Sequence, residues 1–251
     1  MYPPVRRFLQ RCLPTAVVRR LRRWRAPRVV ARFTDADWPY AALVRAHVRA
    51  GDTVVDVGAN MGYITARLAE YVGSTGRVYS FEPVPDTYEQ LAETVRVRKL
   101  DQVTPIHACV SDQPGAVTMV VPEYESGGEN LYESRVVDAA NAGPGRRVAV
   151  QAVRLDDELP ESASPLSFIK IDVEGHERAV IAGGLDVLRR HKPLLIIEVA
   201  EDPDEADSAA AALFATLAEL EYTPYVLVDG RCRPRAKGDR SVDYVFSAAP
   251  L

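Results

Sequence analysis

The sequence has few cysteines, no long apolar run and, at its start, no acidic residues. Cys12, Cys109 and Cys232 stand far apart without CxxC or Cys/His spacing, which argues against a disulfide framework and a structural zinc site. This usage fits a reducing compartment, so we expect a cytoplasmic protein. No apolar run reaches the roughly 18 to 20 residues of a membrane-spanning helix, and the longest ones, such as 194–197, are interpreted as buried strands.

Acidic residues are absent from positions 1–34, which hold ten arginines. Because the whole chain has a net charge of −4, the remainder carries −14. Apolar residues from Val5 to Trp24 recur at helical spacing, interrupted at Pro14, so we expect a basic amphipathic arm over 1–34. It could pack on the acidic body of its own chain, on a second copy in a homo-oligomer, on an acidic partner, or weakly on a membrane. Nucleic acid is not an expected partner, since no aromatic-interleaved basic face follows the arm.

The body from residue 35 to 251 has the composition of one α/β domain. The chain is 47% hydrophobic, enough for one core of this size. Short β-branched runs alternate with helical patterns, which is typical of βα units in a mostly parallel sheet. The predicted strands are 54–57, 77–81, 103–110, 117–121, 147–155, 167–171, 193–199 and a closing pair, 225–228 with 242–246, around a turn at Gly230. The predicted helices are 63–71, 87–99, 176–191 and 206–221, and 122–146 is expected to be an irregular lid, binding loop or disordered segment.

A glycine turn follows the first predicted strand. Residues 56–63 read DVGANMGY, with glycines at 58 and 62. Glycine lets the backbone turn sharply beside a ligand, and the N–H groups that open the next helix can hold an anionic group. A dinucleotide fingerprint needs glycine where this chain has Asn60, which disfavours an NAD(P)-dependent oxidoreductase.

The next two predicted strands also end in suggestive residues. Glu82, in Phe81-Glu82-Pro83, lies about twenty residues beyond the glycine turn, where an acid can accept both ribose hydroxyls of a nucleoside cofactor. Around Cys109 and Val110 the chain is small and apolar, which suits the flank of an adenine ring or a plain strand-to-turn junction.

Titratable residues cluster where the strand 167–171 ends. Asp172, Glu174 and His176 follow it within five residues, and such a cluster can support proton transfer. Capping of the next helix is the structural alternative for the two acids. Glu198 ends the neighbouring strand and would face the same edge of the sheet, unless it is a solvated loop acid like Glu201 and Asp202.

Together these motifs resemble the FkbM family of class I S-adenosylmethionine-dependent methyltransferases. The resemblance covers residues 50–247 and includes Leu155-Asp156-Asp157 in addition to the segments above. It implies a single doubly wound, Rossmann-like α/β fold: a seven-stranded sheet, mostly parallel, with an antiparallel last strand. It also implies S-adenosyl-L-methionine as cofactor and O-methylation of a small-molecule hydroxyl on a sugar, glycolipid or polyketide-type product. The cofactor site expected on this basis comprises Asp56, Gly58, Asn60, Gly62, Tyr63, Glu82, Pro83, Cys109, Val110 and Asp172.

The catalytic group is expected to comprise His176, Asp172, Glu174 and Glu198. An alcohol is barely ionised at neutral pH, so His176 is the candidate base, oriented by Asp172 or Glu174, which could also hold substrate hydroxyls. We expect no metal, although these four residues could instead bind Mg²⁺ or Mn²⁺. The alternative functions are an N-methyltransferase, an NAD(P)-dependent oxidoreductase on a similar fold, and a non-catalytic scaffold.

Overall fold

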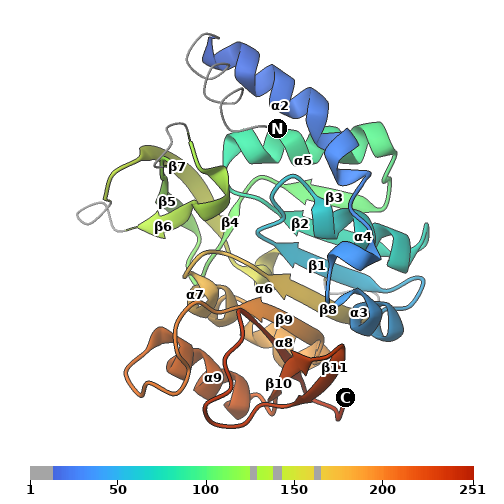
Figure 1. The fold of residues 1–251 in the computed structure, drawn as a ribbon, viewed down its shortest axis with the longest axis vertical. Helices are drawn as coiled ribbons and strands as arrows, with labels where there is room; N and C mark the ends of the chain where they lie inside the picture. Colours follow the sequence, from blue (N-terminus) through green and yellow to red (C-terminus); the bar gives the residue numbers. More distant parts are fainter. Residues whose placement is uncertain (1–13, 125–128, 138–142, 161–164) are drawn as a thin grey trace.

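The computed structural model describes residues 14–124, 129–137, 143–160 and 165–251 (Figure 1). Residues 1–13 of the predicted arm, including Val5 and Cys12, lie outside this part, as do 125–128 and 138–142 of the segment predicted to be irregular. None of the described helices combines the length and apolarity that crossing a membrane requires.

An eight-stranded sheet forms the centre of the described structure (Figure 1). Its order is β11-β10-β12-β9-β8-β1-β2-β3. The five neighbouring strands β9, β8, β1, β2 and β3 are parallel, whereas β12 runs antiparallel to both of its neighbours. The strands span Thr53–Val57 (β1), Arg77–Phe81 (β2), Val103–Ile106 (β3), Leu166–Ile171 (β8), Leu194–Glu198 (β9), Thr223–Val228 (β10), Arg231–Pro234 (β11) and Asp243–Ser247 (β12).

The expected seven-stranded, mostly parallel sheet is wrong in its strand count and at one edge. The turn at Gly230 does not join the closing pair, because it leads from β10 into the additional strand β11. Asp229 and Gly230 both have positive φ, 50° and 75°, which is the requirement of a tight hairpin turn. The last strand, β12, then pairs with the other side of β10 and is antiparallel as expected.

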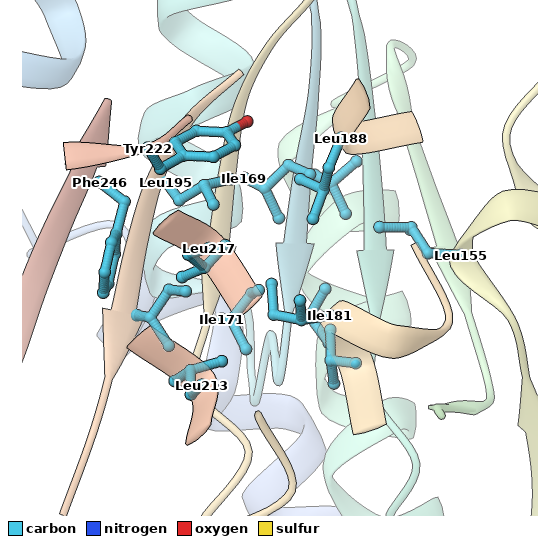
Figure 2. Packing of buried hydrophobic residues seen from close by; sticks show 14 of the residues in the cluster. Leu155, Ile169, Ile171, Ile181, Leu188, Leu195, Leu213, Leu217, Tyr222 and Phe246 are labelled. Atoms are coloured by element: carbon cyan, nitrogen blue, oxygen red, sulfur yellow. The ribbon is translucent and has the colours of Figure 1, made fainter. Parts of the chain in front are cut away.

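Helices cover both faces of this sheet because its strands alternate apolar side chains to either side. One face packs Val54, Phe168 and Ile196 against helices α2 to α5, and the other packs Val55, Ile169 and Leu195 against α6 to α9 (Figure 2). The helices span Thr15–Val30 (α2), Ala41–His47 (α3), Tyr63–Val72 (α4), Pro85–Arg98 (α5), Leu155–Glu158 (α6), Glu177–Ala182 (α7), Leu185–His191 (α8) and Ala209–Glu219 (α9), with 3₁₀ turns at Asp35–Asp37 (η1) and Leu131–Glu133 (η2).

A second, four-stranded sheet stands beside the first and corrects the expectation of a single sheet. Its order is β4-β7-β5-β6. Its strands span Cys109–Val110 (β4), Gly115–Val121 (β5), Arg135–Val137 (β6) and Arg146–Val153 (β7). The strand predicted over 103–110 is therefore split between two sheets. Part of the segment predicted to be irregular, 122–146, is also ordered as η2 and β6, because β6 pairs with β5.

The helix predicted over 176–191 is two helices, α7 and α8, with Gly183 and Gly184 between them. A β-carbon on Gly183 would lie 2.0 Å from the Ser111 carbonyl oxygen, so only glycine lets α7 approach β4 this closely. The break thus fixes α7, whose N-cap is His176, against the small sheet.

Helix α2, the described part of the predicted arm, lies along α5 (Figure 1). It begins directly after Pro14, which fits the tolerance of helices for proline at their start. Arg19 pairs with Asp86, Arg22 with Glu129 and Arg23 with Glu89. Ala26 and Val30 are buried near the end of the helix, so this part of the arm packs on the acidic body of its own chain.

Candidate active site

A cavity opens where the carboxyl ends of the central parallel strands meet the small sheet. This is where open α/β sheets bind ligands. Its floor comes from the loops after β1, β2, β8 and β9, and its roof from the small sheet and η2. The sheet order explains the convergence, because β2, β1, β8 and β9 are consecutive neighbours.

The glycine turn after β1 forms one part of the floor. Gly58 has a φ of 82°, and a β-carbon there would lie 1.8 Å from the Asp172 carbonyl oxygen, so no other residue fits between these two loops. Asn60, also with positive φ, lines the cavity next to it. The turn therefore packs directly against the Asp172 loop and contributes Gly58 and Asn60 to the cavity lining.

Glu82 lies at the end of β2 with only 5% of its surface exposed. Its Oε2 accepts the N–H of Asn60 and its Oε1 the N–H of Val84, both at 2.9 Å. Each oxygen keeps a second lone pair, so the carboxylate can also accept the two hydroxyls of a ribose. Burial raises the pKa of Glu82 to about 7.

Three predicted cofactor residues lie behind the cavity and do not line it. Asp56 is buried in β1, accepts a hydrogen bond of 2.6 Å from Thr65, and has its pKa raised by burial to about 6. Gly62, with a φ of 96°, is the N-cap of α4. Tyr63 packs its ring 5.2 Å from that of Phe33. These residues hold the glycine turn in place from below.

One flank of the cavity is small and apolar. Pro83, Cys109 and Val110 line the cavity together with Ala108. Burial raises the pKa of the Cys109 thiol to about 12, so the thiol stays protonated and unreactive at neutral pH. Cys109 acts here as a small apolar surface.

Asp172, Glu174 and Glu198 meet on the floor of the cavity, one carboxylate oxygen of each lying within 4.8 Å of the others. Burial, followed by the charge of Asp172, raises the pKa of Glu174 and that of Glu198, the latter to about 7. Glu174 has a φ of 52°. This acidic cluster, the oxygens of Asp172, Glu174 and Glu198, can accept hydrogen bonds from hydroxyl groups, and its oxygen donors also suit a divalent cation.

Lys170 is a site residue that the motif analysis missed. Its Nζ lies 3.5 Å from Asp172 Oδ2 and 3.4 Å from Asp243 Oδ1, and the residue is 5% exposed. Burial lowers its pKa, but Asp172, Asp243 and Glu198 outweigh burial and raise it. Lys170 is therefore a buried cation that compensates the acidic cluster.

His176 lines the same cavity and is linked to β4 through Ser111. Its Nε2 lies 3.0 Å from Ser111 Oγ, which donates to Asp112 at 3.1 Å. With the serine proton directed to Asp112, Nε2–H donates to Ser111 and Nδ1 is left as the acceptor. Burial lowers the pKa of His176 below 6.5, so the ring is neutral at pH 7 and able to take a proton.

The roof of the cavity is largely apolar, and most of its residues lie in 122–146, the segment expected to be an irregular lid, binding loop or disordered segment. Met119, Leu131 and Val136 line it, with Tyr132 and Ser134 as its polar members. A strand was predicted over 117–121, which contains Met119, but the pairing of β5 with β6 and β7 that brings these residues together is a tertiary property. The roof therefore closes the side of the cavity opposite the floor with a mostly apolar surface.

Residues 56–224 match the family model described as the methyltransferase FkbM domain. The chain is 32% identical over 161 residues to the 31-O-demethyl-FK506 methyltransferase FkbM of Streptomyces tacrolimicus, a match covering 54% of this chain and 60% of that protein. It is 27% identical over 158 residues to the hexuronic acid methyltransferase AglP of Haloferax volcanii, a match that covers 62% of this chain and 59% of that protein. The matched part thus spans about three fifths of these relatives.

The fold is similar to that of a solved methyltransferase, FkbM from Methylobacillus flagellatus. The TM-score is 0.50 at 16% identity, and the similarity covers 88% of this chain and 58% of that one. At this identity the similarity concerns the fold alone.

Proposed function

The chain belongs to the FkbM family of methyltransferases, and on that premise we propose that it transfers a methyl group from S-adenosylmethionine to a hydroxyl oxygen of a small molecule such as a sugar or glycosylated natural product. The observation that carries the proposal is the cavity in which the glycine turn, Glu82 and the acidic cluster face the neutral imidazole of His176. The relatives support the acceptor class, since one name specifies an oxygen of FK506 and the other a hexuronic acid.

The residues of the floor fit the proposed cofactor. Gly58 leaves room for close approach of a ligand, Glu82 offers two oxygens to the ribose, and Cys109 and Val110 flank the base. Bound there, the cofactor supplies an electrophilic methyl carbon on a sulfonium leaving group. Asp56, Gly62 and Tyr63 support this surface from behind.

The chain must then align the acceptor, exclude water and receive the hydroxyl proton. The acidic cluster holds hydroxyl groups of the acceptor by accepting their hydrogen bonds, which orients the reacting oxygen. As the new carbon–oxygen bond forms and the carbon–sulfur bond breaks, Nδ1 of His176 takes the proton of that oxygen. Such base assistance contributes about 10²- to 10⁴-fold.

The test is transfer of labelled methyl from S-adenosylmethionine to a panel of sugars, glycosides and amines, followed by mass analysis of the position labelled. We expect label on oxygen. Label attached to nitrogen would replace this proposal with an N-methyltransferase.

Cofactor binding is tested separately by thermal unfolding with S-adenosylhomocysteine or NAD, because only a true ligand raises the melting temperature by mass action. Glu82→Ala should weaken S-adenosylhomocysteine binding roughly 100-fold or more, the effect of losing two hydrogen bonds to a charged group. Stabilisation by NAD alone would contradict the proposal.

A further inference from the structure

The side of α2 opposite α5 combines apolar and basic side chains. Val17, Leu21 and Trp24 follow one another at i, i+4 and i+7, so they share one side of the helix. They are 41%, 43% and 56% exposed, among the most exposed large apolar residues of the described chain. We call these three residues the apolar stripe.

Arginines frame the apolar stripe. Arg20 and Arg25 flank it, since successive helical residues are rotated by about 100°, and neither forms an ion pair within the described residues. Arg28 covers the Trp24 ring, its guanidinium carbon 4.0 Å from the ring centroid. Because α2 contains no acidic residue, this side of the helix is uniformly positive.

The body holds α2 in this orientation. Arg19, Arg22 and Arg23 pair with acids of the body on the inner side, and Ala26 and Val30 are buried there. Figure 1 shows α2 on the outside of α5. The inner arginines thus use the nearby acids of the body, and the apolar stripe is presented outward.

We infer that the apolar stripe and its flanking arginines dock on an anionic lipid surface. A helix of 16 residues offers a face of about 24 by 10 Å. The area of such a face is far below the roughly 800 Å² that each partner buries in a stable protein interface. A bilayer needs no complementary pocket, since apolar side chains enter the acyl boundary while arginines remain among anionic headgroups. This inference goes beyond the proposed function and does not depend on it.

Trp24 provides a local probe, because the only other tryptophan, Trp38, is 6% exposed. The full chain is mixed at low salt with vesicles of phosphatidylcholine, or of an equimolar mixture of phosphatidylcholine and phosphatidylglycerol. We expect flotation with the anionic vesicles only, a blue shift of tryptophan emission that Trp24→Phe abolishes, and release by added salt.

Two sets of variants assign the binding to this face. R20Q/R25Q should weaken vesicle partitioning by roughly 10- to 30-fold, as expected for two arginines at an anionic surface, and Leu21→Ala should weaken it further. The matched controls, R190Q/R231Q and Val228→Ala, change exposed residues elsewhere and should leave partitioning unchanged. Circular dichroism confirms that each variant is folded.

Three results would overturn the inference. They are the absence of flotation with anionic vesicles, equal flotation of the arm variants and the wild type, and a lipid-free dimer in sedimentation velocity that Leu21→Ala dissociates. The last would identify a second copy of the chain as the occupant of this face.

Discussion

At the scale of single residues, two positions on the cavity rim have an unusual backbone conformation. Asn60 and Glu174 have left-handed backbone conformations, with φ of 50° and 52°. Such conformations cost on the order of 1–3 kcal/mol for non-glycine residues and persist only where the surroundings enforce them. Here they direct the Asn60 N–H to Glu82 and place Glu174 beside Asp172.

Replacing His176 with alanine should separate catalysis from cofactor binding. Because Nδ1 is the proposed proton acceptor, kcat should fall about 10²- to 10⁴-fold, whereas the affinity for S-adenosylhomocysteine should stay within about twofold. Steady-state kinetics at saturating substrate and calorimetric titration measure the two quantities. His191→Ala, at the end of α8, is the matched control. Normal turnover of the His176 variant would refute the assignment of the base.

The buried carboxyl of Glu82 should make stability depend on pH. Its pKa is about 7 in the folded protein and 4.5 ordinarily, so its contribution to folding is complete below pH 4.5 and is lost as pH rises through 7. Between pH 4.5 and about pH 8, wild type should lose about 3 kcal/mol of unfolding free energy relative to Glu82→Gln. Urea titrations across this range measure the difference. Glu219→Gln, on an exposed part of α9, should follow wild type, and parallel pH profiles for all three proteins would contradict the prediction.

Residues at strand ends were predictable because a short motif contains them. The glycine turn, Glu82 and Asp172 follow a strand directly, and Glu174 and His176 come within five residues of one. Gly58 lines the cavity, whereas Gly62 does not. Lys170 could have been recognised from the sequence, because it is a charged residue inside an otherwise apolar, buried strand. Asp243 left none, since it reaches Lys170 only through the pairing of β12 with β9.

At the scale of elements, the contact between α7 and β4 controls the position of His176. Gly183→Ala would bring a β-carbon within 2.0 Å of the Ser111 carbonyl, so α7 must move away from β4. We expect a loss of about 1–3 kcal/mol in unfolding free energy and a lower kcat, because the Ser111–His176 hydrogen bond is displaced.

Gly184→Ala is the matched control for that substitution. Its β-carbon would lie 3.0 Å from Leu155 Cδ2, at the flexible end of that side chain, whereas Leu155 Cβ and the Val180 carbonyl oxygen would be at the ordinary contact distances of 3.4 and 3.5 Å. Chemical unfolding and steady-state kinetics compare the two variants. Equal stability and kcat would show that the α7–β4 contact does not position the histidine.

Elements with a strong local pattern were predicted well and those defined by pairing were not. The strand 77–81 has the predicted bounds, and α4 extends one residue beyond its predicted end. The break between α7 and α8 was missed because the clash at Gly183 involves a residue more than seventy positions earlier. The small sheet was missed for the same reason, since β4 and β7 pair across a long segment of chain.

At the scale of the whole molecule, the sheet order places acids in or next to three strands, β8, β9 and β12, beside one buried cation. Lys170 already pairs with Asp172 and Asp243, and the raised pKa values of Glu174 and Glu198 let protonation relieve the remaining repulsion, so the acidic cluster does not need a metal ion to be stable. We therefore expect methyl transfer to be insensitive to EDTA and to added Mg²⁺ or Mn²⁺. Initial rates of the chelated and the metal-supplemented enzyme provide the measurement. A rate that collapses on chelation and returns with Mg²⁺ would assign a metal to Asp172, Glu174 and Glu198.

Because the cavity lies between two sheets, the residues proposed to contact the acceptor can change separately from most of those proposed to contact the cofactor. Most of the surface proposed for the cofactor lies at the ends of the central strands, and Cys109 and Val110 of β4 complete it from the small sheet. Met119 and Val136 belong to the small sheet, and Leu131 of η2 packs with them. The hydrophobic core that these residues form is separate from the two cores of the central sheet. A graft of residues 115–153 from a relative, which leaves β4 and the central strands unchanged, should therefore carry over acceptor preference while leaving the proposed cofactor surface intact.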